Sequence, residues 1–181
     1  WDRDVIPALI RPYMEYMCES QRGQVPLDSP SIHCSCTGHT VLKQVIAVYM
    51  DHEYMVYTCL DQKLTTFDLG LDYIELHICP CAPAPVQLVK QGLFPWSPVH
   101  PALAVSLEML EFVSELFVHL APNEAAWADM LVKFLARWGH VFKAQDSLHQ
   151  QFGSALAQYQ VLVHVVDAEI NKQISVARHE V

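Results

Sequence analysis

The sequence lacks the features that would place it in several familiar classes. No apolar run reaches the roughly eighteen residues that a membrane-spanning helix needs. The N-terminus, Trp1-Asp2-Arg3-Asp4, does not have the pattern of a signal peptide. We therefore expect a soluble, intracellular protein without a membrane partner, and the initial Trp1 favours a fragment of a longer chain.

Signatures of common enzymes are also missing. Only 6 glycines are present, and no glycine-rich phosphate loop, His-Glu-x-x-His or Gly-x-Ser-x-Gly motif occurs. A thiol nucleophile could be drawn from Cys59 with His52, or from Cys81 with His77, but neither pair stands in a recognisable catalytic motif. We expect a protein that is not an enzyme.

Basic residues are scarce relative to acidic ones. The 11 Lys and Arg stand against 20 Asp and Glu, which gives a formal net charge of -9. Proteins that bind nucleic acid through its phosphates usually carry a basic stripe, whereas the cations here are scattered along the chain. This balance disfavours DNA as a partner and favours proteins.

What is present describes a globular protein. Hydrophobic residues make up 52% of the chain and charged residues 17%. A length of 181 residues suits one domain, or a small metal-stapled module joined to a helical one.

The first half of the chain predicts one helix and then strands. Apolar residues recur every three or four positions from Val5 to Cys18, and Pro12 should kink or split this helix. The β-branched and aromatic residues of 41–78 predict a small antiparallel sheet, with turns at 51–52 and 61–62. Near its end, aliphatic residues alternate with others, so one strand should bury one side and present the other to a site. The alternating residues are Ile74, Leu76 and Ile78 on one side and Glu75, His77 and Cys79 on the other.

After Pro83 the pattern predicts helices. A short helix should stop at Gly92, and a proline-punctuated linker should span 94–101. A second helix should start at Leu103 and end before Pro122, and Asn123 should cap a third that reaches residue 139. Residues 145–179 should form a single long helix.

These patterns predict an α+β fold in which a small antiparallel β-sheet, with a zinc staple, packs on a mainly α-helical bundle. The expected organisation is an N-terminal helix at 1–20, a cysteine-cluster β module at 32–82 and a helical region at 83–181.

Two Cys-x-Cys pairs bracket the predicted sheet. Cys34 and Cys36 precede it and Cys79 and Cys81 end it, while Cys59 lies inside it. In a reducing compartment such pairs favour metal over disulfides, and a returning sheet could bring them together as the four ligands of structural Zn²⁺. Cys59 and nearby histidines are substitute ligands, namely His33, His39 and His77. Alternatively, the cysteines are buried thiols that serve as small hydrophobic residues.

Taken together, Cys34-Ser35-Cys36, Cys59 and the run from Ile78 to Pro95 resemble the CxC-type cysteine cluster that lies upstream of the catalytic region in Kyakuja-Dileera-Zisupton (KDZ) transposases. Downstream, 98–113, 121–127 and 147–153 look like the helical continuation of the same family. Trp96 and Ala128 depart from it, because relatives often have cysteine there.

The resemblance implies a non-catalytic, zinc-binding accessory domain of a KDZ-type transposase or a derivative, a transposable-element protein of the nucleus, or else cytoplasmic. Its partners would be another protein, the remainder of a transposase, or DNA. The family's catalytic carboxylates would lie beyond this chain, so no transposition chemistry falls to these residues. The alternative is a metal-free module that homo-oligomerises or binds proteins through the helix at 145–179.

Overall fold

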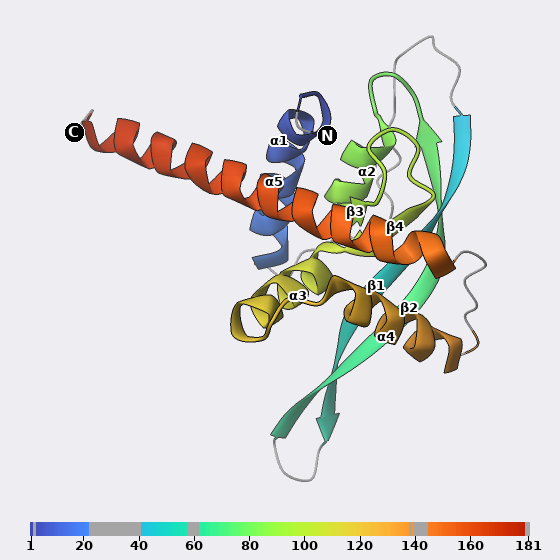
Figure 1. Ribbon diagram of the computed structural model, residues 1–181. Coiled ribbons are helices and arrows are strands. Elements are labelled where there is room, and N and C mark those ends of the chain that lie inside the picture. The colour runs from blue at the N-terminus through green and yellow to red at the C-terminus, as the bar shows by residue number, and fades with distance from the viewer. Residues whose placement is uncertain (2, 22–40, 58–61, 138, 140–144, 180–181) are drawn as a thin grey trace.

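The fold was analysed in a computed structural model, which describes residues 1, 3–21, 41–57, 62–137, 139 and 145–179 (Figure 1). The described residues form both helices and strands. In order, the elements are α1 (Val5–Gln21), β1 (Val41–Tyr57), β2 (Gln62–Ile78), α2 (Ala84–Lys90), β3 (Leu93–Pro95), β4 (Leu103–Ser106), α3 (Leu107–His119), α4 (Glu124–Arg137) and α5 (Gln145–His179).

One four-stranded sheet, in the order β2-β1-β4-β3, organises the described residues, and its strands are mixed in direction. The β1 and β2 strands pair antiparallel, as do β3 and β4, but β1 and β4 pair parallel with Ala47 opposite Ala104. The expected α+β class is confirmed. The expectation of a purely antiparallel sheet is wrong, because β4 joins the sheet through a crossover that includes α2.

The hairpin of β1 and β2 is longer than predicted. Both strands have 17 residues, and Asp51 pairs with Asp68 within the ladder, so the predicted turn at 51–52 does not exist. The other predicted turn, at 61–62, falls partly outside the described residues, and its second residue, Gln62, is the first residue of β2. The far end of this hairpin projects from the body of the molecule (Figure 1).

Two groups of buried side chains fill the interior. The smaller group lies where α2 meets the sheet and contains Val45, Leu76 and Leu88, all at most 1% exposed. The larger group joins α1, the sheet and the other helices, with Phe94 stacked on Trp1 and edge-on to Tyr159 at its centre. As expected, Leu76 is buried between two exposed neighbours on its strand.

Several predicted helix boundaries are confirmed. The last helix begins at Gln145 and ends at His179, and Asn123 caps α4 by accepting a hydrogen bond from the backbone of Ala126 at 2.9 Å. By contrast, α1 continues unbroken through Pro12. The helix predicted from Leu103 begins only at Leu107, because the first residues of this run form β4. Likewise β3 occupies the start of the predicted linker.

Gly92 fixes how α1 packs beside α2. Its φ of +76° is one that L side chains rarely adopt, and a Cβ built on it would lie 2.6 Å from the ring of Tyr16. Glycine therefore both ends α2 and allows Tyr16 of α1 to lie against the backbone. Among the described helices, none combines the length and apolar character needed to cross a membrane.

Candidate functional site

The second cysteine pair lies in a tight turn that follows β2 directly. The backbone N–H of Ala82 donates to the carbonyl of Cys79 at 3.0 Å, which closes a four-residue β-turn with Pro80 at its second position. Proline favours this position because its fixed φ suits the turn. The turn brings the sulfur atoms of Cys79 and Cys81 to 3.2 Å.

The two thiols differ in exposure. Cys79 is 5% exposed, whereas Cys81 is open to solvent. Their separation is too long for a disulfide, whose sulfur atoms lie about 2.05 Å apart. In tetrahedral thiolate-zinc sites with Zn–S bonds of about 2.3 Å, two sulfur atoms lie about 3.8 Å apart. A small rotation of one side chain would therefore let this pair serve as two ligands of one zinc ion.

Gln87 holds this turn from α2. Its side-chain amide nitrogen donates to the carbonyl of Ala82 at 2.6 Å and to the carbonyl of His77 at 2.8 Å. Gln87 is itself 5% exposed, so these bonds replace water at two carbonyls on either side of the cysteines. The backbone that carries Cys79 and Cys81 is thus tied to the helix that follows it.

Sequence patterns did not reveal this role of Gln87. The sequence signal that could have revealed it is the position of Gln87, directly before Leu88 in a helix in which most residues are buried. A polar residue at a buried helical position needs a partner, and Gln87 finds two in the carbonyls of His77 and Ala82. The residue that the sequence placed beside the cysteines, His77, contributes its backbone carbonyl, and its side chain is exposed.

The register of the hairpin relates the two cysteine pairs. Val41 pairs with Ile78, so the first residue of β1 lies beside the last residue of β2. Cys34 and Cys36 lie outside the described residues, in the segment that leads into Val41. Cys36 is five positions before Val41, and five extended residues span at most about 17 Å. The strand residue that follows the first pair in sequence and the strand residue that precedes the second pair therefore lie at the same end of the hairpin.

Cys59 follows β1 in the sequence, between Tyr57 and Gln62. It lies outside the described residues, and its described neighbours along the chain, Tyr57 and Gln62, pair with each other at the far end of the hairpin. Sixteen residue steps at about 3.3 Å separate that end from Ile78, which is roughly 50 Å.

Within the described part of the chain, no group of three or more His, Cys, Asp or Glu side chains could hold a metal ion. Of the five proposed ligands, Cys79 and Cys81 lie together in the described part of the chain. The other three, Cys34, Cys36 and Cys59, are not among the described residues. Cys18, expected on a helix face, is exposed on α1.

These features define a cysteine-turn module joined to a helical body. Residues 58–138 match the family model described as "CxC1 like cysteine cluster associated with KDZ transposases". The resemblance read from the sequence is thereby confirmed for this segment, which is similar to the cysteine cluster of that family. It includes Cys59, Cys79 and Cys81, whereas Cys34 and Cys36 precede it. Searches of curated proteins and of solved structures found no significant match.

The two departures from the family pattern are accommodated by packing. Trp96 is 4% exposed and lies edge-on to Phe152 with ring centroids 6.1 Å apart, while Ala128 is fully buried in the same cluster. Apolar packing thus occupies the two positions where relatives often have cysteine.

Proposed function

We propose that the chain is a zinc-binding accessory domain of a KDZ-type transposase or of a derivative, in which Cys34, Cys36, Cys79 and Cys81 hold one Zn²⁺. The observation that supports this proposal is the pairing of Val41 with Ile78, because Val41 is five positions after Cys36 and Ile78 directly precedes Cys79. The match to a transposase-associated cysteine cluster supports the family context. A nuclear location follows from that context and belongs to the proposal.

The residues at the described half of the site fit zinc. Thiolates prefer zinc to hard cations. Cys81 is exposed, so a zinc ion that carries two further ligands could reach its sulfur. When bound, the ion would supply folding energy by joining the segment before β1 to the turn after β2. Gln87 would then orient the turn by bonding the carbonyls on both sides of it.

The role we assign is binding, and we propose that the domain carries no chemistry of its own. The net charge of -9 supports a protein partner over DNA phosphates. The remainder of a transposase, or a protein recruited to it, is the partner class that fits both the family context and this charge.

The test is zinc stoichiometry in protein purified without added metal, measured in the wild type and in three variants. We expect about one zinc per chain in the wild type and in Cys59→Ser, and loss of zinc in Cys79→Ser/Cys81→Ser. Cys18→Ser, which changes an exposed helical thiol, is the matched control and should keep its zinc. Zinc lost from Cys59→Ser as from the double variant would contradict the proposed ligand set, and a folded, metal-free wild type would contradict the metal site.

A further inference from the structure

A groove of about 650 Å³ is lined by the three helices α1, α3 and α5. None of its lining residues belongs to the cysteine turn. Its floor is mainly apolar. The side chains that form it include Tyr13, Met14, Met17, Tyr159, Val163 and Val166. The hydroxyls of Tyr13 and Tyr159 lie 3.3 Å apart there, which ties α1 to α5 beneath the groove.

Acidic side chains border this floor. Glu111 and Glu115 of α3 and Asp167 of α5 line the groove, and its lining contains no Lys or Arg. None of the three carboxylates forms an ion pair with another described residue. Burial raises the pKa of Tyr13, and the charges of Glu111 and Asp167 raise it further, so the negative potential reaches the floor.

A polar group in the groove wall lacks a partner. The hydroxyl oxygen of Ser114 is shielded from solvent and has no hydrogen-bond partner among the described residues. A buried hydroxyl without a partner carries a cost in free energy. Ser114 lies on the same helix as the exposed Glu111 and Glu115, between the two carboxylates in sequence.

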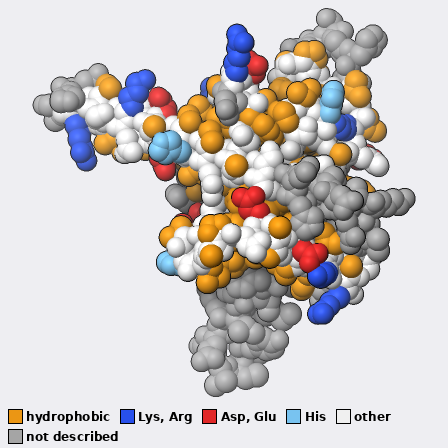
Figure 2. Space-filling view, viewed as in Figure 1, with side chains coloured by type: hydrophobic (Ala, Val, Ile, Leu, Met, Phe, Trp, Pro, Cys, Tyr) orange, Lys and Arg blue, Asp and Glu red, His pale blue; other side chains and the backbone are white. Residues whose placement is uncertain are grey.

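The apolar lining of the groove extends along α5 to its C-terminal part, which projects from the rest of the protein. The C-terminal end of α5 projects beyond α1 (Figure 1), and Ile170, which lines the groove, and Ile174 are 37% and 45% exposed. Figure 2 shows hydrophobic side chains gathered over the helical body and basic ones on this projecting end. An occupant lying along α5 would cover both isoleucines.

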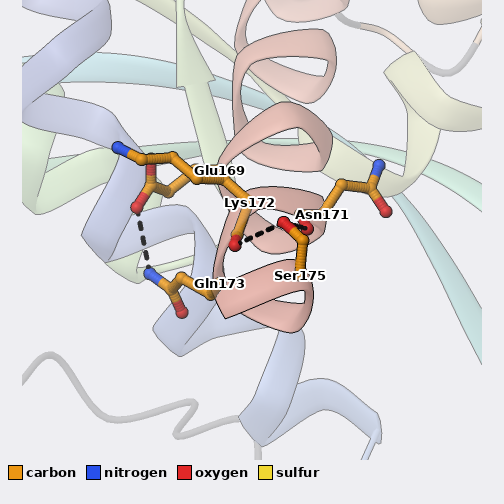
Figure 3. Close-up of polar contacts among 5 residues, drawn as sticks. All are labelled: Glu169, Asn171, Lys172, Gln173 and Ser175. Atoms are coloured by element: carbon orange, nitrogen blue, oxygen red, sulfur yellow. Dashed lines mark hydrogen bonds and ion pairs between the residues drawn. The ribbon is translucent and has the colours of Figure 1, made fainter. Parts of the chain in front are cut away.

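Polar side chains on the projecting end are already engaged with one another. Gln173 donates to Glu169 at 3.1 Å, Ser175 donates to the carbonyls of Asn171 and Lys172, and Lys172 lies 3.8 Å from Glu169 (Figure 3). Lys172 and Arg178 are the basic residues of α5 beside acidic Asp146, Asp167 and Glu169, so a second copy of α5 would bring no net positive charge to the acidic border, with histidine counted as neutral.

We propose that the groove between α1, α3 and α5 binds a cationic amphipathic helix of a partner protein. An apolar floor accepts the apolar face of such a helix, and the border carboxylates accept its Lys or Arg side chains. Two copies of a chain with a net charge of -9 repel each other, which favours a basic partner over self-association. This inference rests on the proposed partner-binding role and does not involve the zinc ligands.

The probe is a fluorescein-labelled helical peptide of about 18 residues, with Leu at positions spaced i, i+3, i+4 and i+7 and Lys elsewhere. Its affinity is measured by fluorescence anisotropy against full-length protein. The groove variant Glu111→Gln/Glu115→Gln/Asp167→Asn should bind about tenfold more weakly, and Ile174→Ser should weaken binding at unchanged charge. Both variants alter exposed residues, so thermal unfolding should stay close to that of the wild type.

A matched control separates this site from general attraction. Asp4→Asn/Asp72→Asn/Glu75→Gln also removes three negative charges, all outside the groove lining, and should bind the peptide like the wild type. Equal weakening in both triple variants would overturn the proposal. So would a mass that doubles with concentration and returns to the monomer in Ile174→Ser, because the occupant would then be a second copy. Zinc is measured on the same samples, so peptide binding by zinc-free, folded protein would contradict the metal site and leave the groove standing.

Discussion

Val41, the first residue of β1, is paired with Ile78, the last residue of β2. The cysteine turn begins one residue after Ile78, so this paired end of the hairpin lies next to Cys79, one of the proposed zinc ligands. The proposed zinc site depends on this pairing, because the two Cys-x-Cys pairs are more than forty positions apart in the chain.

Replacing Gln87 by Met should weaken the cysteine turn. The substitution keeps a long side chain but leaves the carbonyls of His77 and Ala82 without their donor, at a cost of about 1–3 kcal/mol. We expect lower stability in urea and a lower zinc affinity, measured by competition with a chelator. Gln91→Met, which changes the half-buried residue that follows α2, is the control. Equal effects of the two substitutions would show that Gln87 has no special role in holding the turn.

Replacing Gly92 by Ala should destabilise the packing of α1. Both Gly92 and Gly139 have positive φ, so Ala costs about 1–2 kcal/mol of backbone strain at either position. At Gly92 the added Cβ would meet the Tyr16 ring, whereas at Gly139 no atom of the described residues lies within 4 Å of the added Cβ. Urea unfolding should therefore show a larger loss for Gly92→Ala than for Gly139→Ala. The excess should shrink when Tyr16→Leu is added, and an excess that persists would place its cause elsewhere.

The buried tyrosines predict a loss of stability at alkaline pH. Burial raises the pKa of Tyr16 to about 12, and the charges of Glu108 and Glu111 add to this effect. The unfolded chain has a tyrosine pKa of about 10, so it releases this proton first as the pH rises. The contribution of neutral Tyr16 to stability is complete below pH 10 and is lost between about pH 10 and 12.

This pH dependence is measured by urea unfolding between pH 8 and 11. Tyr16→Phe cannot ionise, so its stability should fall less steeply than that of the wild type above pH 10. Tyr73→Phe, at a residue that is 64% exposed, should keep the wild-type slope. A slope in Tyr16→Phe as steep as that of the wild type would contradict the assignment to Tyr16.

Local sequence signals predicted the elements whose ends depend on local chemistry. Asn123 supplies a side-chain cap, Gly92 supplies a positive φ, and the apolar spacing of 145–179 extends over a whole helix. The predicted strand alternation also held up to Ile78. At Cys79 the alternation of exposure ends, because β2 ends at Ile78 and the chain turns at Pro80, so Cys79 is buried whereas His77 is exposed.

Features set by distant parts of the chain could not be read in this way. Residues 103–106 are all buried, so their side chains give no alternation, and their apolar run fits a buried strand as well as the start of a helix. The parallel pairing of Ala47 with Ala104 depends on the whole chain between them. The role of Gln87 likewise depends on where the carbonyls of the turn lie in space.

X-ray absorption at the zinc K-edge, on protein purified without added metal, tests the ligand set most directly. The proposed site predicts four sulfur neighbours at about 2.3 Å around the ion and none of the shorter Zn–N distances of about 2.0–2.1 Å. Nitrogen among the neighbours of the ion would show that a histidine takes the place of one of the four proposed cysteines. A sample of folded protein without zinc would contradict the account that the hairpin brings Cys34 and Cys36 to Cys79 and Cys81.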